Sequence, residues 1–303
     1  MAARHSLMTV HAHPDDETIS TGGVMARYAS EGHRVICVTC TGGEHGEIVV
    51  PALDTPENHA RLADIRRDEL VRALSHLGTI EHHWLGYRDS GMMGQPENEA
   101  AGSLWQADPD EAAGSLVRLV RLSRPQVLVS YNDFGGYGHP DHVRAALVTK
   151  LAFDRAADPT AYPEHGAEGL SPWQPLKLYE TVMDISRRER FAELIAERGV
   201  KTSWLPPPDE TDEQRAEREA HLAHMAEAQG PITTRVDITE QLPAKLAAMA
   251  EHVTQLPRDG FFLGLTLDDW REIGPQESFT LTASTTGVRL PEVDLFAGLP
   301  PET

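Results

Sequence analysis

Apolar residues along the chain form two patterns. Some stand in short unbroken runs, and others recur every three or four positions in longer segments. The unbroken runs predict buried strands, and the recurring segments predict amphipathic helices. In the first half these elements alternate, with strands at 6–12, 34–39, 80–85 and 126–131 and helices at 23–31, 57–77, 108–122 and 140–153. Such alternation predicts an α/β fold whose mainly parallel sheet has helices on both faces.

The second half of the chain has a less regular pattern. Strands are predicted at 176–184 and 234–238, helices at 186–198, 212–228 and 240–252, and a proline-rich connector at 204–209. We therefore expect a Rossmann-like α/β sandwich with a smaller, irregular C-terminal region. Residues 1–175 would form the catalytic core, and residues 176–303 would complete the sheet and shape the substrate pocket.

Two short strings of the same form follow the first and the fourth predicted strands. The string at 11–17 reads His-Ala-His-Pro-Asp-Asp-Glu, and the string at 135–142 ends in His-Pro-Asp-His. Each opens a helix, and the first and fourth strands are neighbours in many doubly wound sheets. Ligand sites in such sheets lie beyond the carboxyl ends of the strands, where the strand order reverses. We therefore expect the two strings to meet there.

The histidines and aspartates of these strings indicate a metal site. Two imidazoles and one carboxylate leave a fourth position for water, which is the open arrangement of catalytic zinc. A second carboxylate beside the metal can accept the proton of that water. Either string alone is also compatible with a helix N-terminus that has an acidic first turn. Two such strings at equivalent strand-to-helix junctions favour the metal site.

The charge of the chain excludes some classes of partner. Lysine and arginine number 27 against 47 aspartates and glutamates, which gives a formal net charge of −20. This excess repels phosphate backbones and anionic lipid surfaces, so we expect neither nucleic acid nor a membrane as partner. No apolar run approaches the roughly 20 residues of a membrane span, and no signal peptide is recognisable.

The two cysteines, Cys37 and Cys40, lie inside the apolar run of the second predicted strand. Positions three apart on a strand face opposite sides, and a strand interior does not suit a redox pair. We interpret both as reduced packing residues, which predicts a reducing compartment and hence a cytoplasmic protein.

Six strings, in the same order along the chain, resemble the LmbE/PIG-L superfamily of zinc-dependent N-deacetylases. They span 12–17, 41–47, 66–70, 89–92, 135–142 and 252–255. The first and the fifth are highly specific when taken together. The likeness is closest to the mycothiol branch, which contains deacetylases of N-acetylglucosaminyl-inositol and mycothiol S-conjugate amidases.

The resemblance implies which residues hold the metal. His13, Asp16 and His142 match the family's metal ligands. The metal would be Zn²⁺, although Fe²⁺ fits the same nitrogen and oxygen donors. Asp15 matches the general base, which takes a proton from the attacking water.

Further matches imply the remaining catalytic and substrate-binding groups. Tyr137 and His139 match residues that stabilise the oxyanion and protonate the leaving amine. Asp141 would orient His139, as a buried carboxylate fixes an imidazole tautomer. The positions that line the sugar or inositol pocket are matched by Glu47, Arg66, Asp89 and Met92.

Simpler interpretations of these pocket positions stay open at the level of sequence. Arg66 and Glu69 are also compatible with the solvated face of a helix. Glu47 and Asp89 are also compatible with turns in loops. The tertiary structure has to decide between these alternatives.

The predicted function is metal-dependent removal of an N-acetyl group from an N-acetylglucosamine-type sugar such as N-acetylglucosaminyl-inositol, with release of acetate and a free amine. A mycothiol S-conjugate amidase, acting on a thiol conjugate, is the alternative within the branch. The strings at 66–69 and 294–298 favour the amidase, whereas Gly138 and the segment 18–20 favour the deacetylase. Whether the chain forms a homo-oligomer stays open.

Two alternatives come from other classes of protein. A non-haem iron oxygenase also binds its metal with two histidines and one carboxylate, usually on an antiparallel β-barrel. The predicted alternation of strands and helices argues against it. A non-catalytic dinucleotide-binding module would need G-x-G-x-x-G after the first strand, where this chain has His-Pro-Asp-Asp.

Overall fold

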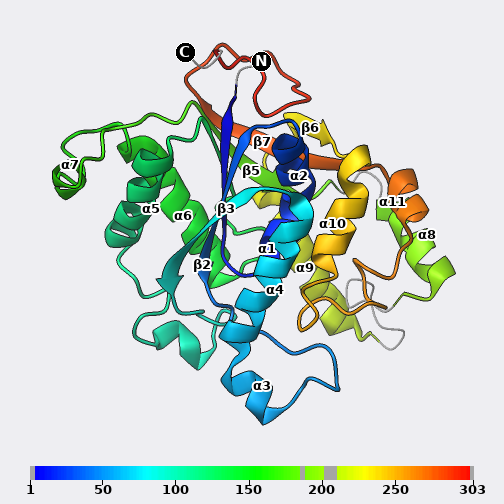
Figure 1. Cartoon of the computed structure of the whole chain (residues 1–303). Helices are drawn as coiled ribbons and strands as arrows, with labels where there is room; N and C mark the ends of the chain where they lie inside the picture. Colours follow the sequence, from blue (N-terminus) through cyan, green and yellow to red (C-terminus); the bar gives the residue numbers. More distant parts are fainter. Residues whose placement is uncertain (1–3, 185–187, 201–209, 301–303) are drawn as a thin grey trace.

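The computed structural model describes residues 4–184, 188–200 and 210–300. A single sheet of seven strands runs through the molecule in the order β3-β2-β1-β4-β5-β7-β6 (Figure 1). Its strands are β1 (Ser6–His11), β2 (Arg34–Thr41), β3 (Ile80–Tyr87), β4 (Val127–Ser130), β5 (Lys177–Val182), β6 (Thr234–Asp237) and β7 (Gln276–Ser284). The first five are parallel, and β7 is antiparallel to both of its neighbours.

Helices cover both faces of the sheet. In chain order they are α1 (Asp16–Ser20), α2 (Gly22–Ser30), α3 (Pro56–Ala60), α4 (Leu62–Leu77), α5 (Pro109–Ser123), α6 (Pro140–Arg155), α7 (Glu164–Ala167), α8 (Arg188–Arg198), α9 (Asp212–Ala228), α10 (Leu242–Met249) and α11 (Leu267–Ile273). Helices α2, α4 and α10 lie on one face, and α5 and α6 lie on the other (Figure 1). In the described ranges, no helix is both long enough and apolar enough to cross a bilayer.

Each face of the sheet has its own hydrophobic core. One core joins Leu7 and Cys37 to α2, α4 and α10, and the other joins Met8 and Cys40 to α5 and α6. Neighbouring strand residues alternate between the two cores because side chains alternate across a sheet. Cys37 and Cys40 are buried and free on opposite faces. The interpretation of both as packing residues is therefore confirmed.

The predicted α/β fold with a mainly parallel sheet is confirmed. The predicted helix at 57–77 is divided at Arg61 into α3 and α4, because α3 buries no residue and has no face to dock on the sheet. Strand β7 was not predicted, since polar residues alternate with Phe279, Leu281 and Ala283 and leave no unbroken apolar run. The predicted connector at 204–209 lies outside the described residues.

The C-terminal region extends the same sheet. Strands β5, β7 and β6 continue the sheet beyond β4. Tyr179, Val236 and Phe279 from these strands share a core with Leu7 of β1. The division of the chain near residue 175 stays a prediction.

The order of the strands reverses between β1 and β4. From β1 the chain proceeds outward through β2 and β3, and it then crosses to β4 on the other side of β1. Leu7 of β1 pairs with Val127 of β4, so the predicted adjacency of these strands is confirmed. The loops that follow β1 and β4 leave the sheet at its carboxyl edge, where doubly wound sheets bind ligands.

Candidate metal centre and active site

The turn after β1 has an unusual backbone at Asp15. Its φ is 120° and its ψ is −35°, a region that L-residues rarely adopt and that costs about 1–3 kcal/mol. Hydrogen bonds hold this conformation: the Asp15 N–H donates to Glu17, and the Asp15 carbonyl accepts from the N–H groups of Thr18 and Ile19. The His13 N–H donates to the carboxylate of Asp16 at 2.9 Å, which closes the turn.

The loop after β4 delivers the second histidine. Gly135 has a φ of 67°, and a Cβ there would lie 2.6 Å from the Cβ of His142, so only glycine fits this close approach. Helix α6 begins at Pro140 with His139 as its N-cap. His142 therefore lies in the first turn of α6, and its Nδ1 donates to the Gly135 carbonyl at 3.1 Å.

Three ligand atoms from these two segments form a nearly equilateral triangle. His13 Nδ1 and His142 Nε2 are 3.3 Å apart, and each lies 3.4 Å from Asp16 Oδ2. Atoms about 2.0–2.1 Å from a zinc ion at tetrahedral angles are roughly 3.3–3.4 Å apart. The donor set predicted from the resemblance therefore has the spacing of three ligands around one zinc ion.

Groups behind the triangle hold the two imidazoles in place. His13 Nε2 lies 3.2 Å from Asp141 Oδ2, so the ring is oriented by a carboxylate on the side away from the ligand atom. His142 is oriented in the same way by the Gly135 carbonyl. Metal-binding histidines almost always have such an outer partner, which fixes the tautomer and leaves the other nitrogen for the metal.

The electrostatics of the site favour a cation. Burial lowers the pKa of His13, but Asp141, Asp16 and Asp89 more than offset this and raise it well above its usual range. Burial likewise raises the pKa of Asp16, but His142 and His13 hold it well below its usual range. Negative charge is therefore concentrated at the triangle, which suits a divalent ion.

Asp15 lies beside the triangle and contacts Arg66. Burial raises the pKa of Asp15 to about 6, and the positive charge of Arg66 opposes this rise. Arg66 Nη2 lies 3.2 Å from Asp15 Oδ2, and the guanidinium also donates to the carbonyls of Pro14 and Gly43. Arg66 and Glu69 are buried, so their interpretation as a solvated helix face is wrong.

Tyr137 and His139 flank the candidate metal ligands. The His139 ring meets His13 edge-on at 4.5 Å between centroids, and the Tyr137 ring meets His142 at 4.9 Å. Burial and the positive charges of His13 and His142 lower the pKa of His139 to about 3. Tyr137 is 40% exposed, so its ring lies between the ligands and solvent.

Asp141 orients a different histidine from the one predicted. Its carboxylate contacts His13, not His139, and it also accepts from Ser90 through both the N–H and the hydroxyl. Asp141 reaches His139 only through its backbone N–H, which donates to His139 Nδ1 at 3.1 Å. The proposed partner was wrong because sequence proximity on a helix does not fix which imidazole a side chain faces. The helix N-cap interpretation is correct for His139 itself.

The predicted pocket residues occupy two kinds of position. Asp89 is buried, accepts from the N–H groups of His45 and Gly91, and lies 3.7 Å from His13 Nε2. Glu47 and Met92 are exposed on the loops that follow β2 and β3. The substrate-binding roles of these residues stay predictions.

Tyr131 is a site residue that was not predicted. It directly follows β4, is buried, and stacks on the His142 ring at 4.3 Å between centroids. Its hydroxyl accepts from the Ala12 N–H at 2.9 Å and interacts with Asp16. Tyr131 therefore contacts two of the candidate metal ligands, His142 and Asp16, and the backbone N–H of Ala12, which precedes His13. Its only sequence signal is its place at the end of a strand before the Gly-rich loop.

Replacing Tyr131 with phenylalanine is expected to weaken the metal site without abolishing the fold. The change leaves the buried Ala12 N–H without its acceptor, which costs about 1–3 kcal/mol. We also expect metal affinity to fall about 10–100-fold, as for other outer partners of ligands. Urea unfolding and metal competition with a chromogenic chelator measure the two effects. Unchanged affinity would contradict the role.

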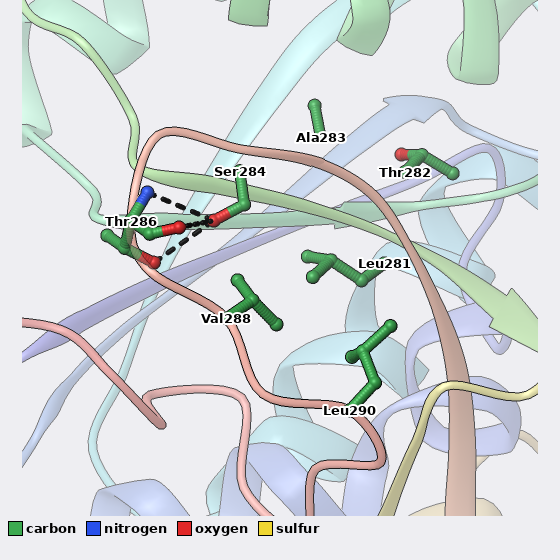
Figure 2. A pocket seen from close by; sticks show the side chains of 7 residues that line it. All are labelled: Leu281, Thr282, Ala283, Ser284, Thr286, Val288 and Leu290. Carbon is green, nitrogen blue, oxygen red and sulfur yellow. Dashed lines mark hydrogen bonds between the residues drawn. The ribbon is translucent and has the colours of Figure 1, made fainter.

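A surface pocket of about 310 Å³ lies elsewhere, at the end of β7 (Figure 2). Its side chains come from β7 and the loop after it, and Ser284 and Thr286 are hydrogen-bonded to each other. None of its seven lining residues is ionisable: they are Leu281, Thr282, Ala283, Ser284, Thr286, Val288 and Leu290. It therefore offers neither acid–base chemistry nor a metal site.

The tail string 294–298 lies away from the metal centre. The Leu295 N–H donates to the Tyr28 hydroxyl, and the Phe296 ring packs against His5 and His33. His5 and His33 precede β1 and β2, so the tail packs at the amino ends of the strands. The metal centre lies at their carboxyl ends, and the tail therefore does not contact it.

Comparison with known proteins identifies the family. A family model described as PIG-L: GlcNAc-PI de-N-acetylase matches residues 8–153. A protein of Streptomyces avermitilis named 1D-myo-inositol 2-acetamido-2-deoxy-alpha-D-glucopyranoside deacetylase is 42% identical, with 97% of each chain covered. The chain belongs to the PIG-L family. A relative of the same name from Nocardiopsis dassonvillei is 43% identical over 96% of this chain and all of its own.

Solved structures share the fold of this PIG-L member at low identity. The N,N'-diacetylchitobiose deacetylase of Pyrococcus horikoshii has a TM-score of 0.61 at 20% identity, covering 91% of this chain and 83% of its own. A 4-carboxy-2-hydroxymuconate hydratase from Pseudomonas putida also has a TM-score of 0.61, at 18% identity, covering 94% and 99%. Because proteins of different activity share this fold, the reaction has to be argued from the site.

Proposed function

We propose that this PIG-L protein removes the acetyl group from an N-acetylglucosaminyl-inositol, releasing acetate and the free amino sugar. The observation that supports this most is the triangle of His13, Asp16 and His142 with the Asp15 carboxylate beside it. Full-length relatives above 40% identity bear the name of a deacetylase of this sugar. Amide hydrolysis needs an activated water, which a metal ion with an adjacent general base can supply.

His13, Asp16 and His142 would hold the metal, and zinc is the metal we propose. Their nitrogen and oxygen donors fit Zn²⁺ and also Fe²⁺. A bound divalent ion lowers the pKa of a coordinated water and polarises a carbonyl oxygen. Asp141 and the Gly135 carbonyl keep the two imidazoles aligned for this task.

The remaining groups act around the amide. Asp15 takes the proton of the water that attacks the carbonyl carbon, and its raised pKa suits a base near neutral pH. The Tyr137 hydroxyl donates to the oxygen on which negative charge develops, which is commonly the largest catalytic contribution. The carbon–nitrogen bond then breaks as the amine receives the proton that Asp15 took from water. His139, whose pKa is lowered to about 3, is neutral at this pH and can donate a ring N–H to the oxyanion. Arg66 keeps Asp15 in position throughout.

Mycothiol S-conjugate amidase is the second candidate for the same site. The strings 66–69 and 294–298 favoured it in the sequence, and in the structure both have roles in packing. Arg66 and Glu69 are buried supports of the loops, and the tail string 294–298 packs at the other end of the sheet. We therefore rank the sugar deacetylase first.

The two candidates from other classes do not fit. An iron oxygenase of the facial-triad kind is typically built on an antiparallel β-barrel, and the sheet here is open with five parallel strands. A dinucleotide-binding module needs glycines at the first turn for the pyrophosphate, and that turn holds His13, Asp15 and Asp16.

A paired assay tests the proposed function. The purified protein is offered N-acetylglucosaminyl-inositol and a mycothiol–bimane conjugate, and acetate and free amine are measured. We expect acetate release from the sugar at a kcat/KM at least about tenfold above that for the conjugate. Faster cleavage of the conjugate would assign the amidase activity, and no release from either would place the substrate outside this branch.

Removal of the metal is expected to abolish turnover reversibly. A chelator such as dipicolinic acid should reduce acetate release to background, because the three ligands then hold no ion to activate water. One equivalent of Zn²⁺ or Fe²⁺ should restore it, and the ion that gives the higher kcat identifies the preferred metal. Full activity in protein shown by elemental analysis to be metal-free would contradict the mechanism.

A further inference from the structure

A buried ion pair lies directly behind the general base. Glu17 and His252 are both 0% exposed, and their carboxylate and ring Nε2 are 2.8 Å apart. The other carboxylate oxygen of Glu17 accepts the Asp15 N–H at 2.9 Å. Asp15, Glu17 and His252 therefore form one continuous chain of hydrogen bonds.

The segment that contains His252 comes from far along the sequence. It follows α10, which packs beside α2 and α4 (Figure 1). It begins about 100 residues after the stretch that matches the family model, which ends at residue 153. The reaction proposed above uses no residue of this segment.

Neighbouring residues of this segment fasten it to two further elements of the site. The N–H and the hydroxyl of Thr254 both donate to Glu69 of α4, the helix that also contains Arg66. The Thr254 carbonyl accepts from Val49, and the Gln255 side chain donates to the Glu47 carbonyl. The segment 252–255 is thus fixed against the loop after β2 and against α4, and these contacts hold the backbone of His252 in place.

We propose that His252 acts through Glu17 as a positioning residue for Asp15, holding the base in its strained backbone conformation. This inference rests on the proposed function, in which Asp15 takes the proton of water. The pair does not touch the substrate or the metal, and its effect passes through the backbone of Asp15.

The strain at Asp15 is the reason such a support is needed. A φ of 120° is unfavourable for aspartate, so the turn keeps it only while surrounding bonds enforce it. Asp16 has its own anchor, since it accepts from the His13 N–H. Loss of the Glu17 acceptor therefore frees Asp15 and leaves the metal ligands in place. Misplacement of a catalytic group by about 1 Å can cost as much as about a hundredfold in rate.

The orientation of His252 supports this role. Its Nε2 faces Glu17, and its Nδ1 has no hydrogen-bond partner among the described residues. The polar function of the ring is therefore directed at Glu17. Side chains that only fill a core do not require a polar ring at a fully buried position.

The test is steady-state kinetics of the metal-loaded enzyme with the deacetylation substrate. His252→Leu removes the donor, and we expect kcat to fall at least about tenfold, with KM within twofold and metal content unchanged. His252→Gln retains an N–H donor near the Nε2 position and should recover most of the lost kcat. Combined with Asp15→Ala, His252→Leu should have no further effect on kcat, because the base it positions is gone.

A matched control separates positioning from general stability. Glu69→Gln alters another buried carboxylate that binds the same segment but does not contact Asp15. We expect it to lower the melting temperature while kcat stays within twofold. Should His252→Leu not fold, Glu17→Gln replaces it: one amide oxygen accepts only one of the two donors, and we expect about a fivefold lower kcat with unchanged metal content.

The outcomes distinguish this inference from the proposed function. A wild-type protein that releases no acetate refutes the proposed function. An active wild type with near-normal kcat in His252→Leu, or in Glu17→Gln where that variant replaces it, overturns the inference alone. An equal loss of kcat from His252→Leu in the wild-type and Asp15→Ala backgrounds also overturns it.

Discussion

Replacement of Asp15 with alanine is expected to lower kcat by about a thousandfold while the metal stays bound. General acid–base groups contribute about 10²–10⁴-fold to rate, and in the proposed mechanism Asp15 is the base at the first step and the proton donor at the last. The ligand triangle does not include Asp15, so its removal leaves all three donor atoms. Steady-state kinetics and elemental analysis on the same sample measure both quantities.

Asp15→Asn is the matched control for this change. It keeps the shape of the side chain and its reach toward Arg66, but an amide cannot accept the proton of water. Both variants should therefore lose turnover to a similar extent. A near-normal kcat in Asp15→Ala would show that another group is the base.

Replacement of His142 with alanine is expected to remove the metal. His142 Nε2 is one of three donor atoms, 3.3 Å from His13 Nδ1 and 3.4 Å from Asp16 Oδ2. We expect affinity to fall by more than about a hundredfold, because a lost ligand costs more than a lost outer partner, for which the range is about 10–100-fold. Competition with a chromogenic chelator measures the affinity, and turnover should vanish with the metal.

The informative control here is His139→Ala. A nitrogen of His139 also lies close to nitrogens of His13 and His142, so these three form a competing ligand set. If Asp16 is the third ligand, His139→Ala keeps its metal and loses only turnover. Loss of metal from His139→Ala together with full occupancy in Asp16→Ala would replace Asp16 by His139. Full occupancy in His142→Ala would exclude His142 from the site.

The architecture of the first half could be predicted because its signals are local. Apolar runs and helical periodicity identify β1–β4, α2, α5 and α6, and alternation of strands and helices dictates a parallel sheet. Strand β7 was missed because Phe279, Leu281 and Ala283 alternate with polar residues and form no unbroken apolar run. Its buried Glu277 accepts from two N–H groups of α2, which only the tertiary structure brings near. The break at Arg61 is likewise visible only in the structure, where α3 buries no residue.

The candidate metal ligands could be predicted from the sequence, but the groups that surround them could not. His13, Asp15, Asp16 and His142 lie in two compact strings, whose spacing indicates a metal site and whose likeness to the family implies the role of each residue. The partners behind them come from distant segments, and no spacing connects them. This is why Asp141 was assigned to His139, although its carboxylate contacts His13.

The sequence by itself determined the fold class, the two strings that meet at the switch point and the type of ligands they contribute, because these depend on neighbours along the chain. Only the tertiary structure decided which groups orient those ligands. Tyr131 after β4 contacts Ala12 after the neighbouring strand β1, more than 100 residues earlier, and His252 contacts Glu17 over more than 200 residues. Such contacts arise when separate elements pack around one core, and buried polar groups must then find partners wherever the fold places them.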